Sequence, residues 1–212
     1  MLVNNAGYGQ NGVIEELSLD DLRRQFEVNV FGLIHVTQEF VPAMRARGRG
    51  RVINIGSVGG DFTSPGASAY YASKYALESF SDGMRQELGR FGIDVVLVKP
   101  GGVDTEFTEH AAPYYPPAME DSPYLEFRES FLAMTEVVLD PERSSYPILA
   151  PTDVSEVVYK AATAKRPRTR YRVGVTARLM PVLVSLRSDR EIDRMMLKAV
   201  AEYDDAGAAG RP

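Results

Sequence analysis

Short apolar runs alternate along this chain with longer segments in which apolar residues recur every three to four positions. The short runs predict buried strands at residues 2–3, 51–57, 93–98 and 171–174. The longer segments predict amphipathic helices at residues 18–45, 69–90, 118–139, 152–162 and 183–200. Strands that alternate with helices are typical of a parallel sheet, so the chain is expected to fold as an α/β protein.

Local signals mark the ends of several predicted elements. Ser18 followed by Asp21 predicts a capping box at the start of the first helix. Thr152 or Asp153 is expected to cap the helix that begins there. Turn residues follow the first three strands: Asn5-Ala6-Gly7, a Gly/Ser/Pro-rich loop at 59–68, and Pro100-Gly101-Gly102. Because open α/β sheets bind ligands at the carboxyl ends of their strands, a site is predicted there.

Three side chains near these strand ends are candidates for catalysis. Tyr70 and Lys74 stand four residues apart, so they can share one face of a helix, and Ser57 ends the preceding strand. A phenol has a pKa of ~10, and an ammonium within about 4–6 Å favours its ionised form. Ser57 can hydrogen-bond a reacting oxygen. Each feature alone is common, but their order and placement together predict acid–base chemistry at a C–O bond.

Composition limits the class of protein. With 212 residues and 44% hydrophobic residues, the chain is long enough for one core, and residues 1–212 are interpreted as a single domain. It has no cysteine, which excludes disulfides and thiolate catalysis, and no metal-binding cluster is visible. Apolar runs fall far short of the roughly 18 residues of a membrane span. A soluble, cytoplasmic protein without a membrane span is expected.

Charge gives no sign of a macromolecular partner. The net charge of −5 provides no general attraction to nucleic acid or to an anionic membrane. Alternating arginines at 166, 168, 170 and 172 are interpreted as an exposed strand face rather than a phosphate-binding surface. His35 and His110 have no clear partners, and a packing or solvated role is expected for each.

The motifs together resemble the classical branch of the short-chain dehydrogenase/reductase family over nearly the whole chain. The resemblance rests on Asn4-Asn5-Ala6-Gly7 after a strand, Asn29 in Val28-Asn29-Val30, Ser57 in Ile55-Gly56-Ser57, Tyr70 through Lys74, and Pro100-Gly101-Gly102-Val103-Asp104-Thr105. It implies a Rossmann-like, doubly wound parallel sheet. It also implies an oxidoreductase that transfers a hydride between NAD or NADP and an alcohol or ketone.

The resemblance also implies residue roles. Tyr70 would be the general acid/base, and Lys74 would lower its pKa and hold the nicotinamide ribose. Ser57 would position the substrate oxygen, and Asn29 would support a proton-relay water. The residues that it places around the cofactor are Asn4, Ala6 and Gly7 on the adenosine side, Asn29, Tyr70 and Lys74, and Pro100, Gly101, Val103 and Thr105 at the nicotinamide.

Residues 104–151 correspond in position to the substrate loop of that family. This segment is rich in proline and aromatic residues, which favours a lid over an apolar substrate such as a lipid-, steroid- or retinol-like alcohol or ketone. Packing of the lid alone explains the aromatic residues equally well. Family members associate through two long helices, here residues 20–45 and 69–90, so a homodimer or homotetramer is expected.

The chain departs from the family at its start. The first strands and the Gly-rich turn that cradles the cofactor pyrophosphate are not in the sequence, so an amino-terminally truncated domain is expected. The strand at residues 2–3 would then form an open edge, and the 212 residues alone would bind NAD(P) weakly or not at all. Two alternatives stay open: a catalytically silent remnant that binds or oligomerises with a partner, and a redox-neutral isomerase on the same scaffold.

Overall fold

Four strands pair side by side in one parallel sheet. The computed structural model describes residues 1–105, 115–116 and 121–203. The strands are β1 (Leu2–Asn4), β2 (Gly50–Ile55), β3 (Ile93–Pro100) and β4 (Arg170–Val173), in the order β1-β2-β3-β4. Val3 lies opposite Ile53, and Ile53 lies opposite Val96. The predicted Rossmann-like α/β sheet is confirmed, and β1 forms one edge of it within the described residues.

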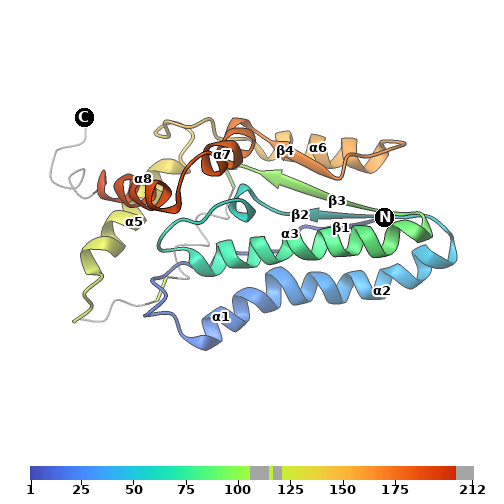
Figure 1. Cartoon of the computed structure of the whole chain (residues 1–212), viewed down its shortest axis with the longest axis horizontal. Coiled ribbons are helices and arrows are strands. Elements are labelled where there is room, and N and C mark those ends of the chain that lie inside the picture. Colours follow the sequence, from blue (N-terminus) through green and yellow to red (C-terminus); the bar gives the residue numbers. More distant parts are fainter. Residues whose placement is uncertain (106–114, 117–120, 204–212) are drawn as a thin grey trace.

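Helices cover both faces of this sheet (Figure 1). One face carries α1 (Leu19–Phe26), the π-helix η1 (Glu27–Gly32), α2 (Leu33–Ala46) and α3 (Ser68–Leu88), and the other carries α6 (Pro151–Thr163). Two short 3₁₀ turns are η2 (Val58–Gly60) and η3 (Gly89–Phe91). The strands run towards the left in Figure 1, where α5 (Leu125–Val138), α7 (Val175–Ser185) and α8 (Asp189–Ala201) gather.

The core follows the alternation of side chains along the strands. Val52 and Val95 face α2, where they pack with Met44. Their neighbours Ile53 and Val96 face the opposite side and pack against α6. Side chains in a strand alternate between the two faces, so a run of consecutive apolar residues predicts a sheet that is covered on both.

The predicted helix at residues 18–45 begins as expected but is not uniform. Ser18 Oγ accepts a hydrogen bond from the Asp21 amide at 3.1 Å, and Asp21 Oδ2 accepts one from the Ser18 amide at 3.3 Å, which confirms the capping box. A π-helical turn then separates α1 from α2. Apolar spacing did not predict this turn, because one extra residue in a turn hardly disturbs a pattern of three to four.

Two predicted helix boundaries are wrong. The helix expected to be capped by Thr152 or Asp153 begins earlier, with Ala150 before Pro151, because the fixed φ of a proline suits the first helical position. Asp153 acts from inside the first turn, where Oδ2 accepts the Ala150 amide at 2.8 Å. The helix predicted at 183–200 is two helices, since Ser188 and Glu191 form a capping box that starts α8.

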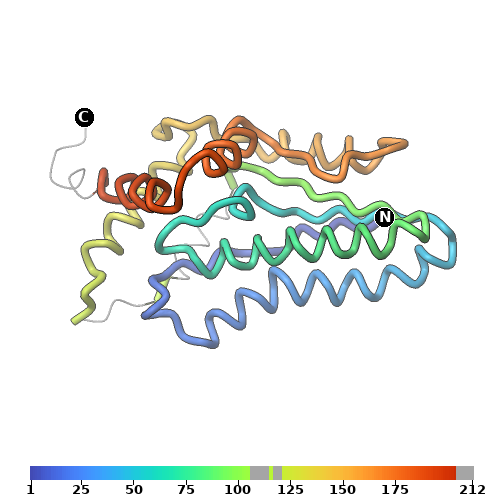
Figure 2. Tube along the Cα trace, in the orientation of Figure 1, coloured from blue at the N-terminus to red at the C-terminus, as the bar shows by residue number. Residues whose placement is uncertain are grey.

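Part of the aromatic segment packs upon itself. Tyr115 and Phe131 are buried together with Val200 of α8, and the ring of Phe127 stacks on Phe131 with centroids 6.2 Å apart. Figure 2 shows α5 beside α8, although they are far apart along the chain. These rings therefore serve packing. His110 and most of the first half of the predicted lid lie outside the described residues.

The described helices include none that is long and apolar enough to cross a lipid bilayer.

Candidate active site

The structure brings Ser57, Tyr70 and Lys74 together, and we call these three residues the reactive site. Ser57 precedes η2 at the carboxyl end of β2, and its Oγ accepts the Gly59 amide at 3.0 Å. The Ser57 and Tyr70 side chains are hydrogen-bonded to each other. Lys74 Nζ lies 5.7 Å from the centroid of the Tyr70 ring and donates to the Ile55 carbonyl oxygen at 3.2 Å. The predicted convergence of a hydroxyl, a phenol and an ammonium is therefore present.

Burial controls the electrostatics of the reactive site. Desolvation raises the pKa of Tyr70, and the hydrogen bond with Ser57 opposes this rise only in part. Desolvation also lowers the pKa of Lys74 from 10.5 to about 8. The net shift of the phenol pKa is therefore upward rather than downward as expected, because desolvation outweighs the groups that favour the phenolate. At neutral pH the Tyr70 hydroxyl thus holds its proton.

Two glycines allow the η2 turn to lie directly on α3. A Cβ at Gly60 would lie 2.8 Å from Glu78 Cγ and 3.1 Å from the Lys74 carbonyl oxygen. A Cβ at Gly59 would lie 3.1 Å from the Tyr71 ring. Any side chain at Gly60 would separate the turn from α3, and with it Ser57 from Tyr70.

Asn29 joins the loop after β1 to the same helix. Its Nδ2 donates to the Tyr8 carbonyl oxygen at 2.9 Å and to Ser73 Oγ at 3.0 Å, while its Oδ1 accepts the Tyr8 amide at 3.0 Å. Ser73 Oγ donates in turn to the Tyr70 carbonyl oxygen at 2.6 Å. Asn29 lies within the π-helical turn η1, a kind of distortion that is frequent at functional sites.

The loop at residues 5–9 passes close to Lys74. A Cβ at Gly7 would lie 3.2 Å from Asn29 Oδ1 and 3.8 Å from Lys74 Nζ, so only a glycine leaves this space open. Ala6 and Gly7 are exposed at the carboxyl end of β1. A ligand at this edge could therefore approach the backbone closely.

Asn4 behaves differently from its predicted neighbours in the loop. Its Nδ2 donates to Thr37 Oγ1 at 3.0 Å and to Asn54 Oδ1 at 2.9 Å, and Asn54 Nδ2 donates to Ser81 Oγ at 2.9 Å. This buried amide network joins β1 and β2 to α2 and α3. The Asn4 side chain thus supports the strand end from within.

The residues predicted at the nicotinamide leave from the carboxyl end of β3. Pro100 is the last residue of that strand, and the Gly101 amide donates to the Val173 carbonyl oxygen at 3.1 Å. Val103 pairs with Leu149 in an isolated bridge, and Thr105 is exposed. Since β2 and β3 are parallel neighbours, this segment leaves the same edge of the sheet as Ser57.

Two buried glutamines in this region were not predicted. The Gln10 amide donates to Gln25 Oε1 at 2.6 Å, and Gln25 Nε2 donates to the Tyr8 carbonyl oxygen at 3.0 Å. Gln25 thereby fixes the same loop that Asn29 holds. A signal was available, since Gln25 and Asn29 stand four residues apart in a predicted helix.

The interpretation of the alternating arginines was wrong for two of the four. Arg166 and Arg168 are exposed, but Arg170 and Arg172 form ion pairs with Glu78, Asp82 and Asp61. His35 is exposed, 3.8 Å from a Glu39 carboxylate oxygen. In the described ranges, no group of three or more histidine, aspartate and glutamate side chains is placed to hold a metal ion.

The fold is a parallel α/β sheet, and a serine, a tyrosine and a lysine converge at the carboxyl ends of its strands. These features define a class of Rossmann-like proteins with acid–base groups placed to act on a C–O bond. The sequence model of the short chain dehydrogenases matches residues 1–115. The chain therefore belongs to the short-chain dehydrogenase family.

Two curated relatives illustrate this membership. An uncharacterized oxidoreductase of Bacillus subtilis is 35% identical over 188 residues, which are 88% of this chain and 65% of the relative. The NADPH-dependent 3-dehydrocapnine reductase of Ornithobacterium rhinotracheale is 32% identical over 204 residues, 93% of this chain and 69% of the relative. The chain thus spans about two thirds of the length of these relatives.

Solved structures agree with the fold. A short-chain dehydrogenase from Streptomyces avermitilis superposes with a TM-score of 0.69 at 30% identity, covering 91% of this chain and 70% of the other. A short-chain dehydrogenase/reductase from Burkholderia phymatum, solved in complex with NAD, gives a TM-score of 0.66 at 27% identity and covers 92% and 66%.

Proposed function

We propose that the protein is an oxidoreductase that transfers a hydride between NAD or NADP and an alcohol or ketone, with Tyr70 as general acid/base. The observation that carries this proposal is the hydrogen-bonded pair of Ser57 and Tyr70 hydroxyls with a buried ammonium beside them. This arrangement can place two donors on one substrate oxygen. Such a pair suits a carbonyl that becomes an alkoxide and then an alcohol.

The residues present fit a nicotinamide cofactor. Lys74 Nζ carries three N–H donors, and the Ile55 carbonyl oxygen accepts one of them, so donors remain for the hydroxyl groups of a ribose. The backbone at Gly7 approaches Lys74 with no side chain between them. Ala6, Asn29 and the segment from Pro100 to Thr105 would complete the binding surface. When bound, the cofactor supplies or accepts the hydride.

When a ketone is reduced, side chains of the reactive site bind the substrate oxygen and protonate it. Ser57 Oγ donates a hydrogen bond to the substrate carbonyl oxygen, and the Tyr70 hydroxyl delivers its proton to that oxygen. The raised pKa of Tyr70 keeps this proton in place at neutral pH until charge develops on the substrate. Lys74 stabilises the resulting phenolate electrostatically. Asn29 fixes the turn of α3 that carries Tyr70, through Ser73.

Names of the relatives support reduction of a keto group. One relative is named as an NADPH-dependent reductase of 3-dehydrocapnine, and the 3-ketodihydrosphingosine reductase of Bacteroides thetaiotaomicron is 30% identical over 200 residues, 94% of this chain and 71% of that protein. We propose an apolar substrate of the lipid-, steroid- or retinol-like kind. The aromatic composition of residues 104–151 supports this, beyond the rings that pack with α8.

We further propose that copies of the chain associate through α2 and α3. Both helices expose large apolar side chains, including Val36 and Phe40 on α2 and Phe80 on α3, with 43–49% of their surfaces accessible. Exposed apolar surface of this kind marks an interface between proteins. Light scattering of the purified protein should give the mass of a dimer or tetramer, and a Phe40→Glu, Phe80→Glu variant should be monomeric.

The experiment that tests the activity is a turnover assay. The purified protein is mixed with NADH or NADPH and a panel of ketones of increasing apolar size, and loss of the reduced cofactor is followed. We expect turnover that requires Tyr70 and increases with the apolar size of the ketone. Substrate conversion without net cofactor change would indicate a redox-neutral isomerase instead. Cofactor binding without turnover of any ketone would overturn the proposal, and binding of neither cofactor would favour a silent remnant.

A further inference from the structure

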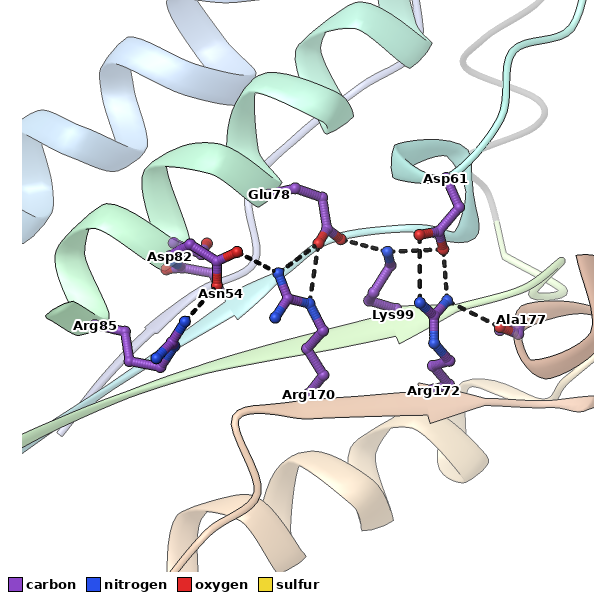
Figure 3. Close-up of polar contacts among 10 residues, drawn as sticks. Asn54, Asp61, Glu78, Asp82, Arg85, Lys99, Arg170, Arg172 and Ala177 are labelled. Atoms are coloured by element: carbon purple, nitrogen blue, oxygen red, sulfur yellow. Dashed lines mark hydrogen bonds and ion pairs between the residues drawn. The ribbon is translucent and has the colours of Figure 1, made fainter. Parts of the chain in front are cut away.

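A fully buried lysine lies behind the reactive site. Lys99, on β3, is 0% exposed, and its Nζ lies 2.7 Å from Asp61 Oδ2 and 2.5 Å from Glu78 Oε1. Figure 3 shows it between the two carboxylates, with an arginine from β4 on each side. We call Asp61, Glu78, Asp82, Lys99, Arg170 and Arg172 the ion cluster.

The two arginines of β4 pair with all three carboxylates of the ion cluster. Arg172 binds both carboxylate oxygens of Asp61, with Nη1 at 2.5 Å and Nη2 at 3.3 Å, and its Nη1 also donates to the Ala177 carbonyl oxygen of α7. Arg170 Nη2 lies 3.1 Å from Glu78 and 2.7 Å from Asp82.

Charge balance makes burial of the cluster tolerable. Within the cluster three cations face three carboxylates, and Arg85 adds a fourth cation beside Asp82 at its partly exposed end. Each buried charge therefore has an opposite charge next to it. Burial acts to raise the pKa of Asp61, but the hydrogen bonds and charges of Arg172 and Lys99 outweigh it and hold that pKa below its usual value. Asp61 is therefore ionised and firmly paired at neutral pH.

Three members of the cluster stand next to residues that the proposed function uses. Asp61 follows the η2 turn that Ser57 begins, and Glu78 lies one turn after Lys74 on α3. Lys99 directly precedes Pro100. The η2 turn is only three residues long and includes two glycines, so it has little structure of its own to hold Ser57 in place.

We propose that Lys99 is a positioning residue: through Asp61 and Glu78 it clamps the Ser57 turn onto α3 and so sets the Ser57 and Tyr70 hydroxyls for one substrate oxygen. This proposal rests on the proposed function for the meaning of that alignment. Misplacement of a reacting group by about 1 Å can cost about 100-fold in rate. A residue that holds the turn in place can therefore change the reaction rate strongly without contacting the substrate.

Amide hydrogen exchange of the whole protein tests the clamp without any turnover. In Lys99→Met, which keeps an unbranched side chain of nearly the same length but removes the charge, peptides covering residues 56–62 should exchange at least about 10-fold faster. Peptides from α2 and β1 should speed up only as far as the loss of global stability requires, so the signal is the excess at 56–62. Asp61→Asn is a milder second variant, in case Lys99→Met does not fold, and should loosen the same segment. Lys198→Met is the matched control, because Lys198 pairs with Glu202 in an exposed position at 3.7 Å.

Kinetics of the same variants separate positioning from general damage. Lys99→Met should lower kcat by about 10- to 100-fold with KM within about twofold, because substrate contacts stay in place. Lys99→Arg, which keeps the charge, should recover part of the loss.

The exchange measurements distinguish a clamp on the Ser57 turn from a general loss of stability. Faster exchange at the Ser57 turn, in excess of any increase in α2 and β1, supports the clamp, while unchanged exchange, or faster exchange spread evenly over the chain, overturns it. If wild-type protein shows no turnover with any ketone, the proposed function fails, and the exchange result still decides whether the ion cluster holds the turn.

Discussion

Two buried lysines flank the η2 turn, and their surroundings are opposite. Lys74 makes no ion pair with any described residue, donates to a backbone carbonyl, and has its pKa lowered to about 8. Lys99 is even more buried, but two carboxylates lie within 2.7 Å of its ammonium.

The difference shows that burial alone does not identify a functional lysine. An ammonium without an anion has donors and charge to offer to a ligand, at a cost in stability. An ammonium between carboxylates has neither to offer, and its pairing stabilises the surrounding elements. The predictions below test whether activity and stability divide between the reactive site and the ion cluster in this way.

Loss of the Tyr70 hydroxyl should have the largest effect, and it should be on activity. Tyr70→Phe is expected to lower kcat by about 10²- to 10⁴-fold, the range for loss of a general acid/base. Steady-state turnover with the best ketone measures this. Tyr71→Phe is the matched control, since Tyr71 is the adjacent phenol and bonds Ser64. Equal losses in the two variants would contradict the assignment of Tyr70.

Loss of the Lys99 charge should have the largest effect on stability. Lys99→Met leaves Asp61 and Glu78 with one cation fewer in a desolvated place, and removal of one partner from a buried pair costs about 3–5 kcal/mol. Urea unfolding measures the change in free energy. Lys198→Met should change it by less than about 1 kcal/mol. A similar small change in both variants would mean that the cluster contributes little.

Burial of Lys74 should make the free energy of unfolding depend on pH. The unfolded chain keeps the Lys74 proton up to its ordinary pKa of 10.5, whereas the folded chain releases it near 8. The unfolded state thus binds more protons between these values, so this group makes stability rise with pH there, by up to about 3 kcal/mol.

Comparing the wild type with Lys74→Met isolates the contribution of Lys74 to the pH dependence of stability. Urea unfolding at pH values from about 7.5 to 9.5 should show wild type gaining stability relative to the variant. A constant difference across this range would show that Lys74 is not desolvated as described.

The Asn4 network should have a smaller effect, and on stability alone. Asn4→Ala removes two donated hydrogen bonds and leaves the acceptors Thr37 Oγ1 and Asn54 Oδ1 buried, which costs about 1–3 kcal/mol. If cofactor affinity falls while the free energy of unfolding does not, the Asn4 side chain acts on the ligand instead.

The sequence predicted the reactive site better than the ion cluster for a physical reason. Ser57, Tyr70 and Lys74 stand in a fixed order near one strand end and on one helix turn, so local spacing carries the information. The members of the ion cluster come from β3, β4, α3 and the residue after η2, and only the assembled sheet brings them together. Arg170 and Arg172 were visible as an alternation, but their partners were not.

The fold shows the same division. Strands and capping boxes with a local signature were predictable, as at Ser18, and the boundary at Ser188 could have been read from Glu191 three residues later. The pKa of Tyr70 could not be predicted, because it depends on how closely atoms crowd the hydroxyl and on where the Lys74 ammonium is directed.

Because of the π-helical turn, the local structure between α1 and α2 depends on the number of residues there. A π turn is an α-helix with one residue inserted, so removal of one residue between Glu27 and Gly32 would restore regular winding. The wider turn takes up one extra residue over the arc that a regular helix covers with one residue fewer, so the helix beyond it would keep its orientation relative to α1. The backbone around Asn29 would nevertheless close up, and the Asn29 side chain would change its position relative to Tyr8. A single-residue deletion in this segment is therefore expected to disturb the loop after β1 while leaving α2 in register.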